Sequence, residues 1–192
     1  MEKKAFVTKE LIETIVKDYP TPFHIYDEKG IRENARALKE AFSWNPGYKE
    51  FFAVKATPNP FLIQILKEYG CGCDCSSYTE LMLSDAVGMR GEDIMFSSND
   101  TPAEEFLLAE KLGAIINLDD ITHIDFLEKT LGYLPKRLSC RFNPGGYFAM
   151  GTDIMDNPGD AKYGFTREQM FDGFRILKAK GVEEFGIHAF LA

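Results

Sequence analysis

Residues 51–59 have the sequence FFAVKATPN, an aromatic and β-branched run that carries one lysine and ends near a proline. Side chains alternate between the two faces of a strand, so Phe51, Ala53 and Lys55 are predicted to share one face. An apolar run of this length is typical of a strand covered on both sides. A lone ammonium is costly there unless it is paired or used covalently, and burial lowers the pKa of a lysine and makes its amine nucleophilic. The alternative is a lysine at a strand end whose amine reaches water.

The strand-then-helix pattern repeats along the rest of the chain. Strands are predicted at residues 51–56, 71–76, 94–97, 114–118, 137–142 and 184–191. Helices are predicted between them, at spacings of roughly 20 residues, which indicates parallel strands joined by helical crossovers. Both a (β/α) barrel and an open doubly wound sheet fit this pattern. No strand is followed by the glycine-rich turn that binds dinucleotide phosphates, which favours the barrel and disfavours an NAD-binding oxidoreductase.

The predicted fold class is α/β, a partial (β/α)8 barrel of the TIM type. Such a barrel needs eight strand–helix units, and this chain supplies about six of them. Residues 1–25 are expected to form an N-terminal helix and a lead-in strand at residues 23–26, and residues 26–192 the incomplete barrel. We expect the remaining strands to lie beyond Ala192. An unclosed sheet leaves two unpaired edges, so the isolated piece is expected to aggregate easily and to be inactive.

Composition excludes several classes of function. The 192 residues are 45% hydrophobic and 27% charged, which suits one globular domain or part of one. A net charge of −8 argues against a nucleic-acid or anionic-membrane surface. No apolar run approaches a membrane span, and no signal-peptide core follows Met1, so a cytoplasmic protein is expected.

Cys71, Cys73 and Cys75 alternate with Gly72 and Asp74. On a strand the three thiols point to one side, which does not match the spacing of zinc ligands across a turn. No metal site is predicted. Free cysteine packs as a small hydrophobe, so we expect these thiols on the outer face of a strand beneath helices.

Function in a barrel sits at the C-terminal ends of the strands. The residues predicted at such ends are Lys55, Asp74, Asn99, Asp119, Arg141 and either His188 or Phe190. A single polar residue at a strand end is ordinary, because strand ends lie near water. The whole set at one edge suggests a functional site. The loop at residues 143–165 is longer than barrel loops usually are, and we interpret it as a lid or a subunit contact.

Several of these stretches resemble motifs of the fold-type III decarboxylases that depend on pyridoxal 5'-phosphate. The similar stretches, in family order, are residues 21–27 (TPFHIYD), 52–56 (FAVKA), 72–81 (GCDCSSYTEL), 140–145 (CRFNPG), 161–164 (AKYG) and 186–190 (GIHAF). Members of this group act on diaminopimelate, ornithine, arginine or carboxynorspermidine. The Asn143-Pro144-Gly145 sequence after Arg141 resembles diaminopimelate decarboxylase most.

The resemblance implies an alanine racemase-like barrel with pyridoxal phosphate as cofactor. Lys55 would be the catalytic residue, joined to the cofactor as a Schiff base. Asp74 would belong to the hydrogen-bonded surroundings of the cofactor, with Glu80 supporting it from the following helix. Arg141 would lie beside the ring and its phenolic oxygen, where its charge would also keep Asp74 ionised. The implied reaction converts meso-diaminopimelate to lysine and carbon dioxide.

One position departs from the family pattern. Phe190 stands where the family has a second histidine that stacks on the cofactor. Phenylalanine can stack on a pyridine but cannot donate a hydrogen bond, and His188 lies two residues earlier on the same face. Both remain candidate cofactor-binding residues.

The resemblance also implies parts that lie beyond Ala192. These are a glycine-rich phosphate loop, a C-terminal β-domain and a segment that completes the site of a partner subunit in a homodimer. The alternative to an enzyme is a non-catalytic pyridoxal phosphate-binding protein on the same barrel.

Overall fold

A computed structural model describes residues 5–146, 159 and 161–189. Its contacts group the chain into two compact units, Met1–Pro46 and Gly47–Ala192. The boundary predicted between residues 25 and 26 stays a prediction. In the described residues no helix is both long and apolar enough to cross a membrane.

The first unit consists of two helices, α1 (Lys9–Asp18) and α2 (Glu28–Ala41). Both begin at a side-chain cap: the Thr8 hydroxyl accepts from the N–H of Leu11 at 3.2 Å, and the Asp27 carboxylate accepts from the N–H of Gly30 at 3.0 Å. The lead-in strand predicted at residues 23–26 is wrong, because these residues form no strand. A short extended segment becomes a strand only when its backbone groups find a pairing partner.

The described residues of the second unit form six strands with helices between them. In chain order its elements are β1 (Phe51–Ala53), the 3-10 turn η1 (Val54–Ala56), α3 (Pro60–Glu68), β2 (Gly72–Cys75), α4 (Tyr78–Ala86), η2 (Gly91–Asp93), β3 (Ile94–Phe96), α5 (Ala103–Leu112), β4 (Ile115–Leu118), α6 (Thr122–Leu131), β5 (Arg137–Phe142), α7 (Arg167–Ala179) and β6 (Glu184–Ala189).

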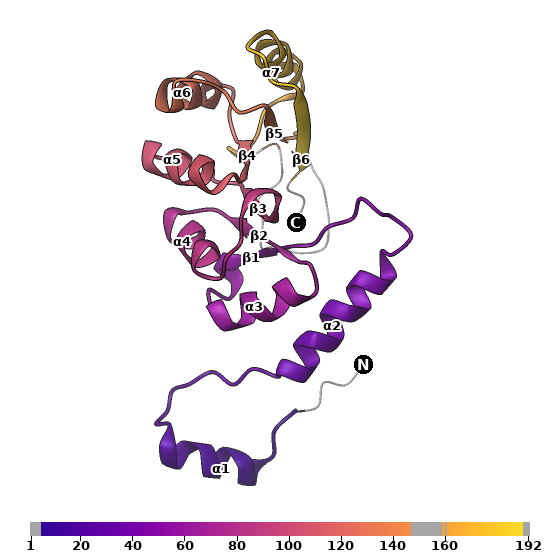
Figure 1. Ribbon diagram of the computed structural model, residues 1–192, viewed down its shortest axis with the longest axis vertical. Coiled ribbons are helices and arrows are strands. Elements are labelled where there is room, and N and C mark those ends of the chain that lie inside the picture. The colour runs from indigo at the N-terminus through magenta and orange to yellow at the C-terminus, as the bar shows by residue number, and fades with distance from the viewer. Residues whose placement is uncertain (1–4, 147–158, 160, 190–192) are drawn as a thin grey trace. The chain divides into compact units, whose positions relative to one another are not determined.

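The six strands form one parallel sheet in the order β1-β2-β3-β4-β5-β6. Each strand is therefore added on the same side as the one before it, whereas a doubly wound sheet reverses direction part-way. Helices α3 to α7 lie along one side of the sheet (Figure 1). This arrangement is the wall of a (β/α) barrel, as predicted.

The outer face of the sheet packs against the helices and forms the core. Its fully buried side chains alternate along the strands and include Cys73, Cys75, Ile94, Phe96, Ile116, Leu118, Leu138 and Cys140. The Sγ of Cys75 lies 3.1 Å from the Oγ of Ser84 on α4, so the thiols pack beneath helices as predicted. Burial raises the pKa of Cys75 and of Cys140 to about 12, which keeps both thiols protonated and unreactive.

Strand β1 is shorter than predicted. It ends at Ala53, and Lys55 lies in the η1 turn with an exposed side chain. The prediction of a lysine within a strand covered on both faces is wrong, and the alternative of a strand-end lysine whose amine reaches water is the correct one. Among the described residues β1 pairs with β2 alone. The last residue of β1 in this pairing is Ala53, so the strand ends before Lys55.

Several helices begin at a side-chain cap: the Ser77 hydroxyl caps α4, and Thr166 with Gln169 forms a capping box at α7. At α5 the cap position is Pro102, and no side chain caps the helix. Thr101, one residue too early to cap α5, is instead buried.

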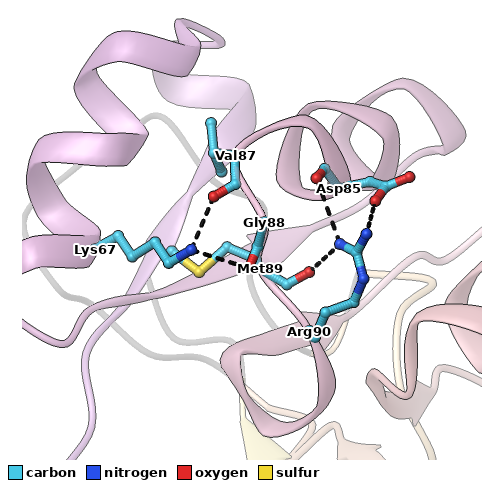
Figure 2. A network of polar contacts seen from close by, with 6 residues as sticks. All are labelled: Lys67, Asp85, Val87, Gly88, Met89 and Arg90. Atoms are coloured by element: carbon cyan, nitrogen blue, oxygen red, sulfur yellow. Dashed lines mark hydrogen bonds and ion pairs between the residues drawn. The ribbon is translucent and has the colours of Figure 1, made fainter.

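The C-terminal end of α4 is held by two cations. The Nζ of Lys67, on α3, donates to the carbonyl oxygens of Val87 and Gly88 at 2.9 and 3.0 Å (Figure 2). The Arg90 guanidinium binds the Asp85 carboxylate in the same network. Carbonyls at a helix end have no hydrogen-bond partner within the helix, and the Lys67 amine satisfies two of them. The positive charges also interact favourably with the negative end of the helix dipole.

Replacing Lys67 with methionine is therefore expected to lower the free energy of unfolding by about 1 kcal/mol, the typical contribution of such hydrogen bonds. Urea denaturation measures this. The control is Lys111→Met on α5, whose side chain is exposed. Equal stability of the two variants would contradict the prediction.

Candidate active site at the C-terminal edge of the sheet

The inner face of the sheet carries polar side chains toward the C-terminal edge. They alternate with the core residues and come from five consecutive segments: Asp74 on β2, Ser97 after β3, Asp119 after β4, Arg141 on β5 and His188 on β6. Because parallel strands end at the same edge, residues more than 100 positions apart in the sequence meet here.

Lys55 enters this edge from the first strand. Ala53, the last residue of β1, is paired with Asp74 of β2, and Lys55 follows two residues later. Its side chain is exposed. The register places Lys55 and Asp74 at the ends of neighbouring strands.

Asp74 is held by Ser97 from the next strand along the sheet. The Ser97 hydroxyl donates to the Asp74 Oδ1 at 2.6 Å. A hydrogen bond to a carboxylate is shorter and stronger than one between neutral groups, and it fixes the orientation of the acceptor. Sequence reasoning missed Ser97, although the alternation of Ile94, Met95 and Phe96 already puts residue 97 on the face of Met95.

Arg141 pairs with Asp119 rather than with Asp74. Its Nε lies 2.9 Å from the Asp119 Oδ1, and the two side chains are only 9% and 6% exposed. Its second guanidinium nitrogen donates to the Ser97 carbonyl at 2.9 Å. The Asp119 carboxylate follows β4, the strand adjacent to β5, and the prediction that the Arg141 charge also keeps Asp74 ionised stays a prediction.

His188 lies beside Arg141 in the sheet. The two residues are paired in the β5–β6 register, and the Nδ1 of His188 is buried without a hydrogen-bond partner among the described residues. His188 also lines a hollow of about 270 Å³ on the inner face, together with Met95 and Ser139. Burial lowers the pKa of His188, the Arg141 charge lowers it further, and Asp74 opposes both.

The lowered pKa gives stability a pH dependence. The folded protein keeps His188 neutral, whereas the unfolded chain takes up a proton near pH 6.5. Above that pH, His188 is neutral in both states and does not lower the free energy of unfolding. As the pH falls below it, the unfolded chain gains a proton that the folded protein does not, so the free energy of unfolding decreases. When the pH is lowered from about 7.5 to about 5.5, we expect the free energy of unfolding to decrease less in His188→Gln than in the parent protein. Urea denaturation at both pH values measures this. The control is His24→Gln, a change of an exposed histidine, and an unchanged pH dependence in His188→Gln would contradict the expectation.

Glu80 organises the loop between β2 and α4. Its buried carboxylate accepts from the N–H and hydroxyl of Ser76 at 2.9 and 3.0 Å and from the hydroxyl of Ser77 at 3.0 Å. Glu80 thus supports the segment that leaves the Asp74 strand. Asn99 is exposed beyond β3.

The end of β5 is closed by a return of the chain at Gly164. The N–H of Phe165 donates to the Arg141 carbonyl at 2.7 Å, and the N–H of Asn143 donates to the Phe165 carbonyl at 2.9 Å. Gly164 has φ +87, and a Cβ there would lie 3.0 Å from the Asn143 nitrogen and 3.1 Å from the Arg141 oxygen, so only glycine fits. Most of the loop predicted to be a lid or subunit contact lies outside the described residues, as does Phe190.

Residues 28–191 match the family described as pyridoxal-dependent decarboxylase, pyridoxal binding domain. The chain belongs to the pyridoxal-dependent decarboxylase family. Membership confirms the family predicted from the motifs and pyridoxal phosphate as the cofactor.

Curated relatives of this decarboxylase domain include two with more than 30% identity. Protein TabA of Pseudomonas amygdali pv. tabaci is 36% identical over 181 residues, which are 94% of this chain and 42% of that protein. A diaminopimelate decarboxylase of Thermoplasma acidophilum is 32% identical over 179 residues, which are 92% of this chain and 42% of that protein. The chain therefore spans less than half the length of these relatives.

Solved structures show the same fold as this decarboxylase domain. A lysine decarboxylase from Selenomonas ruminantium aligns with a TM-score of 0.81 at 21% identity, covering 99% of this chain and 47% of that one. A diaminopimelate decarboxylase from M. jannaschii in complex with L-lysine aligns with a TM-score of 0.82 at 21% identity, covering 93% and 44%. These alignments confirm the partial barrel.

The side chains at the C-terminal edge fit pyridoxal phosphate chemically. Lys55 offers a primary amine that can condense with its aldehyde, Arg141 a buried cation and His188 an aromatic ring. The unsatisfied Nδ1 of His188 is the kind of buried polar atom that a bound polar group would satisfy.

Proposed function

We propose that this chain forms the cofactor-binding part of an amino-acid decarboxylase in which Lys55 holds pyridoxal phosphate covalently. Support comes from the arrangement of Lys55, Asp74, Arg141 and His188 at one edge of the sheet in a member of the pyridoxal-dependent decarboxylase family. The bound cofactor supplies an electron sink for the charge left on carbon when carbon dioxide departs.

Each residue has a separate task in this proposal. The exposed Lys55 amine would hold the cofactor covalently, because a primary amine can condense with its aldehyde. Asp74, fixed by Ser97, would offer its carboxylate to hydrogen-bond donors of the bound molecule. Arg141 holds a positive charge at a fixed position, and His188 supplies a flat ring beside it. Phe190 remains the other candidate for the stacking residue.

The substrate we propose is meso-diaminopimelate, which would be converted to lysine. Curated relatives with the name diaminopimelate decarboxylase support this substrate, as does the Asn143-Pro144-Gly145 sequence. Ornithine, arginine and carboxynorspermidine are the competing substrates of the same chemical class. A homodimer and a cytoplasmic location remain predictions.

Borohydride reduction of the full-length protein tests the attachment site, because it makes a lysine–cofactor link permanent. Peptide mass spectrometry should then find the cofactor mass on Lys55. A label on another residue would refute the site. Release of carbon dioxide from each of the four amino acids tests the substrate, and a labelled Lys55 without any carbon dioxide release would favour the non-catalytic binding protein.

A further inference from the structure

We propose that Asp119 is a positioning residue that acts through Arg141. This inference rests on the proposed function, because it concerns how the cofactor-binding cation is held. The buried Asp119 carboxylate and the Ser97 carbonyl fix the Arg141 guanidinium from two neighbouring strand ends, so that it meets the cofactor in one orientation.

The geometry of the pair carries the proposal. The Oδ1 of Asp119 lies 2.9 Å from the Nε of Arg141, and both side chains are almost fully buried. A guanidinium is planar, so contacts at two of its nitrogens define the orientation of the whole group. The second contact is the one to Ser97 at 2.9 Å.

The same contacts extend to Asp74. Ser97 accepts from Arg141 through its carbonyl and donates to Asp74 through its hydroxyl. One polar chain therefore joins Asp119, Arg141, Ser97 and Asp74 across the ends of β4, β5, β3 and β2. Displacing Arg141 would disturb Ser97 and, with it, the Asp74 carboxylate that Ser97 holds.

Other ionisable groups near Asp119 do not replace Arg141 as its partner. Burial raises the pKa of the Asp119 carboxyl, while Arg141 and, more weakly, His123 favour its charged form. His123 is itself kept neutral because burial lowers its pKa. Asp120 is engaged elsewhere, since its Oδ1 accepts from the N–H and hydroxyl of Thr122 at 2.8 and 2.6 Å.

The test compares Asp119→Asn with Asp120→Asn in the full-length protein. Each variant removes one negative charge without changing side-chain size, but only the first removes the carboxylate bound to Arg141.

The measurements are the dissociation constant of pyridoxal phosphate, its visible absorption spectrum when bound, and the urea concentration at the midpoint of unfolding. We expect Asp119→Asn to weaken binding about tenfold, equivalent to about 1.4 kcal/mol, and to shift the spectrum. Asp120→Asn should bind within about twofold of the parent, even if it is destabilised by loss of the hydrogen bonds that Asp120 accepts from Thr122.

A double-mutant cycle with Arg141→Gln shows whether Asp119 acts through Arg141. Once Arg141 is absent, Asp119→Asn should weaken cofactor binding less than about twofold further. If the two substitutions weaken cofactor binding independently, so that their fold-changes multiply in the double variant, the proposal is overturned. Parent-like cofactor binding and absorption spectrum in Asp119→Asn would overturn it as well. If Asp119→Asn does not fold, Asp119→Glu, which displaces the carboxylate, takes its place in the cycle. A parent protein that does not bind pyridoxal phosphate would refute the proposed function instead.

Discussion

Lys55→Ala is expected to lower the decarboxylation rate of the full-length protein at least about a thousandfold, because removal of a covalent catalyst removes its whole pathway. Lys55→Arg should be as defective, since a guanidinium keeps the positive charge but is too weak a nucleophile at neutral pH. The structure gives a reason to expect little loss of stability. Lys55 is exposed in a turn after β1, and its replacement leaves the buried core intact.

The matched control is Lys111→Ala, a change of an exposed lysine on α5. It should keep parent-like activity and the absorption band of bound cofactor. Lys55→Ala should lose that band but unfold at the urea concentration of the parent. Activity within about tenfold of the parent in Lys55→Ala would remove Lys55 from the catalytic role.

The largest effect on stability is expected from Phe106→Ala. Phe106 is fully buried on α5, with ring centroids of Phe96, His123 and Phe126 at 5.9 to 6.2 Å. Its ring joins β3 to helices α5 and α6, the layer on which the site is built. Truncation removes buried apolar surface and leaves a cavity, so the free energy of unfolding should fall by about 3–5 kcal/mol.

Phe61→Ala provides the same chemical change at a surface position. Phe61 lies on α3 and is 78% exposed, so its loss should cost less than about 0.5 kcal/mol. Urea denaturation of both variants measures the difference. A loss of less than about 1 kcal/mol in Phe106→Ala would mean that the core can close around the missing ring.

The sequence alone determined the class of fold and most of its elements. Apolar runs separated by helical periods predicted all six strands, and the limits of β5 were predicted residue for residue. Helix caps such as Thr8, Asp27 and Ser77 also depend only on residues close in sequence, because a cap forms within one helical turn. Motif order predicted the family, which residues 28–191 confirm.

Only the tertiary structure decided which polar groups meet. Pairing of Arg141 with Asp119, and of Ser97 with Asp74, depends on which strands are neighbours and on which side chains share their inner face. The end of β1 before Lys55 depends on pairing across strands, which the apolar run cannot reveal. Local structure follows from residues close in sequence, whereas the site is assembled from strand ends brought together by the sheet, and its contacts are therefore not encoded in any single stretch.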